Sequence, residues 1–146
     1  MLCCLMLFNL DTFLPYKLSL ATNTVSQSLA DEYAKFNITR TQWRILAVLG
    51  GGVDLTAGAI AKKTLMDKTT LSRAIKNLIE RKLVKRKASQ TDGRSSPLSL
   101  TTSGRKLFEK ITPIVLSHER KLISKISRDD RVVLDRILNT LLEESE

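Results

Sequence analysis

The sequence predicts a mainly α-helical protein with one small β-hairpin wing, a winged helix-turn-helix with dimerisation helices at both ends of the chain. Three observations predict it. Two amphipathic helical segments follow one another across a tight turn. Two short strands then enclose a polar loop of nine residues, and apolar residues recur every three or four positions on both sides of this central part. We expect a single unit over 1–146, with a winged-helix lobe at 40–104 and a helical dimerisation region at 10–36 and 105–146.

The first predicted helix covers the amino-terminal part of the dimerisation region. Its apolar face consists of Leu10, Leu14, Leu18, Ala21, Val25, Leu29, Tyr33 and Phe36. Pro15 is compatible with a helix only near the first turn, because proline lacks the amide hydrogen that a helix interior requires. A second helix begins after Thr39, which forms a capping box with Gln42, and ends at the glycines 50–52.

The helix-turn-helix follows. A short helix begins at Thr56, a turn lies at 64–66, and Asp67 is a favourable N-cap for a longer helix. That longer helix has a core side made of Leu71, Ile75, Leu78 and Ile79. The segments LVKRK and PLSL are the two predicted strands, and the loop 88–96 between them, with its Asp92-Gly93 turn signal, is the candidate wing.

Two helices are predicted after the wing. The first starts at Thr101 or Thr102 and runs to about Leu122, with a bend at Pro113. The last starts at a capping box of Ser127 and Asp130. Its apolar stripe consists of Val133, Ile137, Leu138 and Leu141. A winged helix of this size cannot cover such stripes by itself, so the two ends of the chain predict a homodimer interface.

The positive charge is concentrated in one third of the chain. The formal net charge is +9, and residues 56–110 hold fourteen Lys and Arg against four Asp and Glu, a net charge of +10. The segments before and after carry net charges of 0 and −1. The helix-turn-helix and wing therefore form the region suited to a polyanion such as DNA.

The side of the longer helix opposite its core face combines long cations with short hydroxyls and carries no acid before Glu80. Cations neutralise phosphates, and short hydroxyls can approach base edges in the major groove. For any single residue a phosphate contact is favoured over base recognition, and a solvated helix face is the alternative for the whole strip. The predicted DNA-binding residues are Lys68, Thr69, Thr70, Ser72, Arg73, Lys76, Lys85, Arg86, Lys87, Asp92 and Arg94.

The wing and its base have distinct predicted roles. Arg94 at the wing tip would enter a minor groove, unless it pairs with Asp92 and only shapes the hairpin. Lys85, Arg86 and Lys87 at the base of the wing suit flanking phosphates.

The sequence does not predict an enzyme. It holds one histidine and neither a phosphate-binding loop nor a metal-ligand pattern, so we expect no cofactor and no metal. The opening MLCCLMLF is too short and lacks the basic start of a secretory signal, so we expect a cytoplasmic protein with no membrane partner. Adjacent Cys3 and Cys4 are expected to be ordinary reduced thiols, with a redox-sensing role as the alternative.

The run from Leu55 to Gly104 resembles the core of the MarR family of transcriptional regulators. That family carries a wing of the form D-x-R followed by L-x-L-T-x-x-G, and the matching positions here are Asp92, Arg94, Leu98, Leu100, Thr101 and Gly104. The similarity extends over about 10–145, because TQWRILAVL resembles the family's second helix and the terminal helices resemble its dimerisation arms.

The resemblance implies a symmetric dimer on a pseudo-palindromic operator, and a pocket for a small aromatic anion between the dimerisation arm and the lobe. Tyr16, Trp43, Arg44 and His118 are the candidates for lining that pocket, with core or surface packing as the alternative for each. The family's peroxide-sensing branch has a reactive cysteine within the first helix. Here both cysteines precede that helix, which argues against a thiol switch.

These observations predict a sequence-specific DNA-binding transcriptional regulator, and the resemblance to the MarR family implies a repressor released by a small aromatic ligand. The alternatives are a winged-helix module for protein–protein interaction, which predicts an apolar or acidic outer face, and an architectural DNA binder without a ligand.

Overall fold

The computed structural model describes residues 8–87 and 96–143. The helices are the 3-10 turn η1 (Leu10–Thr12), α1 (Leu14–Ala34), α2 (Arg40–Gly50), α3 (Ala57–Thr64), α4 (Lys68–Glu80), α5 (Thr102–Ile123) and α6 (Arg128–Glu143). The strands β1 (Val84–Arg86) and β2 (Leu98–Leu100) pair antiparallel, with Lys85 opposite Ser99. The mainly helical fold with a small hairpin is therefore confirmed.

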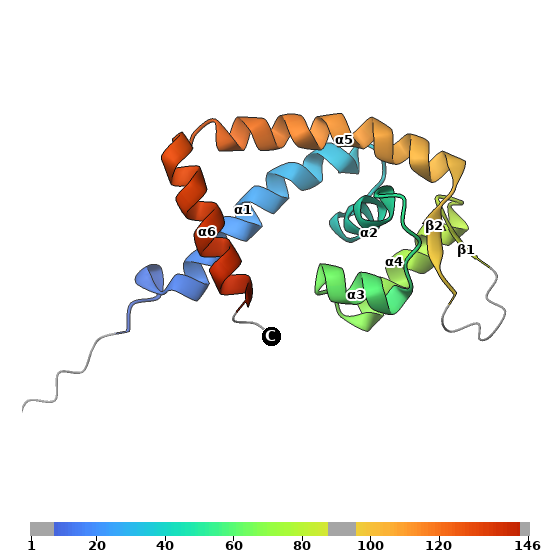
Figure 1. The fold of residues 1–146 in the computed structure, drawn as a ribbon, viewed down its shortest axis with the longest axis horizontal. Coiled ribbons are helices and arrows are strands. Elements are labelled where there is room, and N and C mark those ends of the chain that lie inside the picture. Colours follow the sequence, from blue (N-terminus) through green and yellow to red (C-terminus); the bar gives the residue numbers. More distant parts are fainter. Residues whose placement is uncertain (1–7, 88–95, 144–146) are drawn as a thin grey trace, which may run out of the picture.

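The winged-helix lobe and an arm, which consists of the first part of α1 and of α6, lie beneath one long helix. Figure 1 shows α5 running along the top, with α2, α3, α4 and the hairpin gathered under one end, and α6 descending from the other end on the side where α1 begins. Within the lobe, α2 packs on α3 and α4, and the hairpin packs on α2 and α4. α6 and the start of α1, at the other end of α5, lie apart from this lobe (Figure 1).

The core lies between α2, α4, the hairpin and the inner side of α5. Its most deeply buried side chains include Ile45 and Leu46 of α2, Ile75 and Leu78 of α4, and Ile111 of α5, all at most 1% exposed. Burying each of these side chains contributes roughly 1.5–3 kcal/mol. The core positions predicted on α4 are confirmed for Leu71, Ile75 and Leu78, while Ile79 is only partly buried.

The first helix is shorter than its apolar periodicity predicts. Leu10 belongs to the separate turn η1, which Asn9 caps by accepting a hydrogen bond from the Asp11 amide. α1 starts at Leu14, immediately before Pro15, because a proline further inside a helix would leave a carbonyl of the preceding turn without its donor. At the other end α1 stops at Ala34, and Phe36 packs on the core from the following turn, whose Asn37 has a φ of 56°.

The predicted helix starts are largely confirmed. Thr39 and Gln42 form both hydrogen bonds of a capping box, and Thr56, Asp67 and Thr101 cap α3, α4 and α5. α6 differs in detail. The Ser127 hydroxyl accepts from the Asp130 amide at 3.1 Å, but it then donates to the Asp130 carboxylate at 2.6 Å, so the two side chains bond each other instead of closing a full capping box.

The segment LSLTTSG joins the hairpin to α5 by a close backbone contact. The Thr101 hydroxyl donates to the Lys82 carbonyl at 2.6 Å, and the Thr101 amide donates to the Leu83 carbonyl at 3.0 Å. A Cβ atom at Gly104 would lie 1.9 Å from the Leu83 carbonyl oxygen. Only glycine allows the first turn of α5 to approach the hairpin this closely, which fixes the direction in which α5 leaves the lobe.

Candidate nucleic-acid interface

α4 divides into a buried side and a charged outer side, as the sequence predicts. Asp67 at its N-cap accepts from the Thr70 amide at 2.8 Å. The hydrogen bond from the Thr70 side chain, followed by that from its backbone, lowers the pKa of the fully exposed Asp67 carboxyl below its ordinary value. The carboxylate thus holds the first turn of α4 as its N-cap.

The predicted DNA-contacting side chains of α4 are all exposed. They are Lys68, Thr69, Thr70, Ser72, Arg73 and Lys76. Lys76 approaches Glu80 at 4.0 Å, with both side chains well exposed, and such a surface pair contributes little. Across the described residues, neither Lys68 nor Arg73 has an ion pair with an acidic side chain. Apart from the Thr70 hydroxyl, which bonds Asp67, and the weak Lys76–Glu80 pair, the strip therefore presents cations and hydroxyls that are available to an anionic partner.

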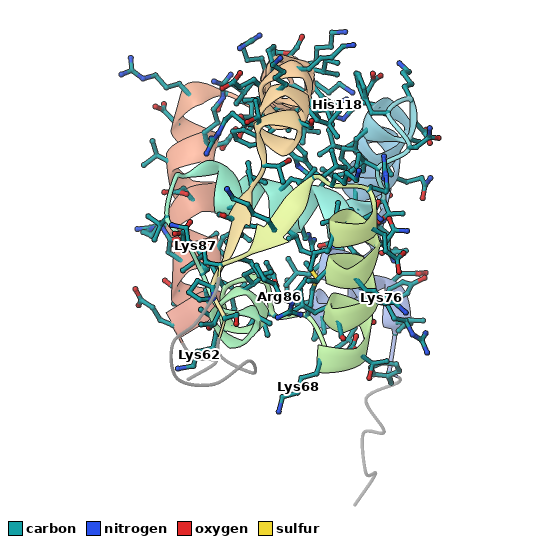
Figure 2. All side chains as sticks on the ribbon, turned by 90° about the vertical axis from the view of Figure 1, so that its right-hand side faces the viewer. Lys62, Lys68, Lys76, Arg86, Lys87 and His118 are labelled. Carbon is teal, nitrogen blue, oxygen red and sulfur yellow. The ribbon has the colours of Figure 1, made fainter. Side chains whose placement is uncertain are left out.

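The predicted cations at the base of the wing have different surroundings. Lys85 is exposed on β1, opposite Ser99. Arg86 lines a cavity of about 420 Å³ between α3, α4 and β1, together with Lys62 and Lys68. Figure 2 shows Lys62 and Arg86 on one side of α4 and Lys76 on the other. Lys87 forms an ion pair with Asp54. A phosphate would have to compete with this acid for Lys87.

The structure leaves two predicted DNA-binding residues undescribed and adds one cation that was not predicted. Asp92 and Arg94 lie outside the described residues, so their predicted roles stay predictions. Lys62 was missed by the sequence analysis. It lies in the last turn of α3, and its signal was the Lys62-Lys63 pair at the end of the first helix of the helix-turn-helix.

The four candidate ligand residues are not brought together by any described contact. Trp43 stacks between Tyr33 and Phe108, with ring centroids at 6.1 and 5.8 Å, and so joins α1, α2 and α5. Arg44 is exposed on α2, and Tyr16 is partly buried near the start of α1. Burial raises the pKa of the Tyr33 phenol. Trp43 therefore packs between three helices, and its predicted place in a ligand pocket stays a prediction.

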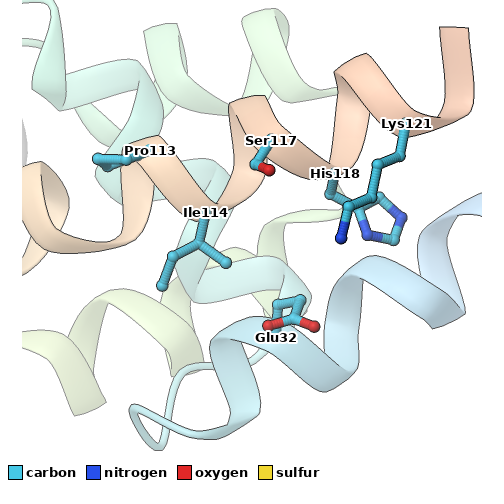
Figure 3. Close-up of a pocket in the computed structure, with 6 residues that line it drawn as sticks. All are labelled: Glu32, Pro113, Ile114, Ser117, His118 and Lys121. Carbon is cyan, nitrogen blue, oxygen red and sulfur yellow. The ribbon is translucent and has the colours of Figure 1, made fainter. Parts of the chain in front are cut away.

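His118 lines a cavity of about 300 Å³ between α1 and α5, shown in Figure 3. Its Nε2 lies 3.0 Å from the Ser28 hydroxyl of α1. Pro113 and Ile114 supply apolar wall, and Lys121 and Glu32 supply charge. The hydrogen bond from Lys35 at 2.7 Å holds the pKa of the Glu32 carboxyl below its ordinary value, with smaller effects from His118 and Lys121.

Comparison with known proteins shows to which family this chain belongs. A sequence model described as the MarR family matches residues 36–95. The organic hydroperoxide resistance transcriptional regulator of Bacillus subtilis is 35% identical over 112 residues, which cover 75% of this chain and 73% of that protein. The chain belongs to the MarR family.

Solved structures of MarR-family regulators share the fold. The DNA complex of MepR from Staphylococcus aureus matches with a TM-score of 0.80 and 27% identity, covering 90% of this chain and 98% of that one. A MarR/EmrR family regulator from Acinetobacter sp. ADP1 matches with a TM-score of 0.85 and 25% identity over 94% and 98% of the two chains. The protein is a MarR-family DNA-binding transcriptional regulator.

Residues 8–87 and 96–143 contain no group of three or more His, Cys, Asp or Glu side chains placed to hold a metal ion. None of the helices described there is both long and apolar enough to span a membrane.

Proposed function

We propose that this MarR-family protein is a homodimeric repressor that binds a pseudo-palindromic operator and is released by a small aromatic anion. The exposed strip of cations and hydroxyls on α4 carries the proposal. A protein-interaction winged helix would present an apolar or acidic strip at this place, whereas the strip from Lys68 to Lys76 contains no acid. Base recognition falls to Ser72, Arg73 lies where it can contact either a base edge or a backbone phosphate, and further phosphate contacts fall to Lys68, Lys76 and Lys85.

Exposure of the arm supports the dimer. No residue of α6 is buried, yet Val133, Ile137 and Leu138 form an apolar stripe along it, and each is at least 40% exposed. Leu14 and Leu18 on α1 are exposed as well. An isologous interface of these stripes would bring two α4 helices to successive major grooves, about 34 Å apart.

The cavity beside His118 supports a ligand. Its apolar wall suits an aromatic ring, and Lys121 and His118 suit a carboxylate or phenolate. The cavity lies between α1 and α5, and the Tyr33–Trp43–Phe108 stack connects these two helices to the lobe. A ligand that changes the separation of α1 and α5 would therefore change the placement of the lobe relative to the arm.

Selection of bound duplexes from a random pool, followed by affinity measurements at several salt concentrations, tests the DNA-binding part. A dimer that contacts roughly six to ten phosphates loses about 10³–10⁵ in affinity between about 50 and 200 mM salt. An affinity that does not change over this range, or a pool that yields no common sequence, would contradict the proposal.

Titration with benzoate and ring-substituted benzoates tests the ligand part. We expect these compounds to release the operator from the wild type, and Lys121→Met to lose much of that response while it keeps its operator affinity. Lys125→Met, four residues further along the chain and absent from the lining of the cavity, is the matched control. An equal response in all three proteins would place the ligand elsewhere.

A further inference from the structure

A second cavity flanks α4 on the side away from Arg86. It has a volume of about 340 Å³ and lies between the start of α2 and the exposed side of α4. Its lining consists of Thr39, Thr41, Gln42, Thr70, Arg73, Ala74 and Asn77. No acidic side chain is among them, so its polar groups are three hydroxyls, two carboxamides and one guanidinium.

The two carboxamides form the fixed floor of this cavity. Gln42 Nε2 donates to Asn77 Oδ1 at 2.7 Å, and Gln42 Oε1 accepts from the Thr39 amide at 3.0 Å. Gln42 is only 6% exposed, so these bonds hold α2 and α4 at a set distance. The cavity is therefore a built feature of the lobe, with its walls fixed before any partner arrives.

The remaining groups are suited to an anion with several oxygens. Thr41 forms no side-chain hydrogen bond among the described residues, and the Thr39 hydroxyl oxygen already accepts from the Gln42 amide at 3.2 Å, which leaves its hydrogen available for donation. Arg73 provides the charge, and its guanidinium can bind two oxygens of one phosphate. Two hydroxyls and a guanidinium without an acid favour a phosphate over a neutral ligand.

The position of the cavity indicates which phosphate. A helix with its side chains is about 10–12 Å wide, close to the width of about 12 Å of the major groove. A helix that fills the groove therefore has one DNA backbone along each flank. On one flank of α4 lie Lys62 and Arg86, and on the other lies the cavity with Thr41.

We propose that this α2–α4 cavity is the seat of a single DNA backbone phosphate, held by Thr41, Thr39 and Arg73. The seat rests on the proposed binding of α4 in the major groove and extends the interface to α2, which the sequence analysis left out. The cationic flank attracts one backbone through charge, and the hydroxyl-lined flank positions the other through directed hydrogen bonds. The seat thereby sets the depth and register of α4 and contributes equally to every DNA sequence.

Thr41→Val tests the seat, because it removes one hydroxyl and keeps the shape of the side chain. We expect the full-length dimer to lose about tenfold in affinity for the operator and for random duplex alike, which is the size of one hydrogen bond to a charged group. Thr102→Val, at an exposed position in the first turn of α5, is the matched control and should bind as the wild type does. Thermal unfolding of both variants verifies that they fold.

Operators in which one phosphate at a time is replaced by a neutral methylphosphonate locate the contact. In the wild type, the methylphosphonate at one position on the backbone beside α2 should lower the affinity for the operator. In Thr41→Val, that same substitution should lower the affinity several-fold less. Equal costs in both proteins at every position would overturn the seat. A wild type that binds no duplex would instead contradict the proposed function itself.

Inorganic phosphate at constant ionic strength distinguishes a seat for DNA from a site for the free ion. We expect it to displace operator no better than chloride does. Displacement by phosphate that Thr41→Val abolishes would show a site for a free phosphate ion and overturn the assignment to the DNA backbone.

Discussion

The winged-helix lobe and α6 use the same residue types in opposite ways. In the lobe, Ile45, Leu46 and Leu78 are completely buried. On α6, Ile137 and Leu138 keep 48% and 40% of their surface exposed, and no residue of the helix is buried. The lobe has a core of its own, whereas an isolated helix of 16 residues is marginally stable in water. The difference is the one expected if the lobe folds by its own contacts and α6 packs against a second copy of the chain, as proposed above.

Leu138→Asp is the strongest test of this contrast. In a dimer it places an unpaired carboxylate within an apolar interface, which costs several kcal/mol, whereas on a solvated helix it costs almost nothing. We expect monomer or aggregate by light scattering and loss of operator binding. Asn139→Asp, the neighbouring residue on the polar side of α6, is the control and should remain dimeric. A dimeric Leu138→Asp protein that still binds operator would show that this stripe is not the interface.

Gly104→Ala tests the lobe side of the comparison. The added methyl would lie 1.9 Å from the Leu83 carbonyl oxygen, so the junction of the hairpin with α5 must open. We expect a loss of about 1–3 kcal/mol in the free energy of unfolding, measured with urea.

Gly58→Ala in α3 is its matched control. A Cβ there would meet nothing closer than the Thr56 hydroxyl at 3.9 Å, and alanine in a helix is favoured over glycine by roughly 0.5–1 kcal/mol. The two substitutions should therefore change stability in opposite directions. Similar stabilities for both would show that the approach of α5 to the hairpin is looser than the structure indicates.

Arg73→Ala and Lys85→Ala compare two parts of the lobe surface. If Arg73 contacts a base, its loss costs about 1–3 kcal/mol on the operator and relaxes preference at particular positions. Lys85→Ala should weaken operator and random duplex by the same smaller factor and reduce the salt slope by about 1. Equal weakening of both duplexes by Arg73→Ala would assign that side chain to phosphate alone, in agreement with the seat between α2 and α4.

The sequence predicted local features better than relations between distant segments. The caps at Thr39, Thr56 and Asp67 were predictable because each depends on residues within four positions. The Gln42–Asn77 hydrogen bond and the ion pair of Lys87 with Asp54 join residues 35 and 33 positions apart, and no local pattern indicates them. For the same reason the charged strip of α4 was predicted, while the cavity between α2 and α4 was not.

The smallest expected effect concerns the turn between α3 and α4, where the lobe contains a strained residue. Leu65 has a φ of 53° and a side chain that is 84% exposed. A left-handed backbone costs an L-residue other than glycine, asparagine or aspartate about 1–2 kcal/mol, and an exposed leucine gains no burial in return. Leu65→Asn should therefore raise the free energy of unfolding by up to about 1 kcal/mol, seen as an increase in the thermal midpoint. Leu65→Ala separates the two causes, because it removes the apolar side chain but keeps the strain. Stabilisation by asparagine alone would locate the strain in the backbone, whereas equal stabilisation by both would attribute it to the exposed side chain.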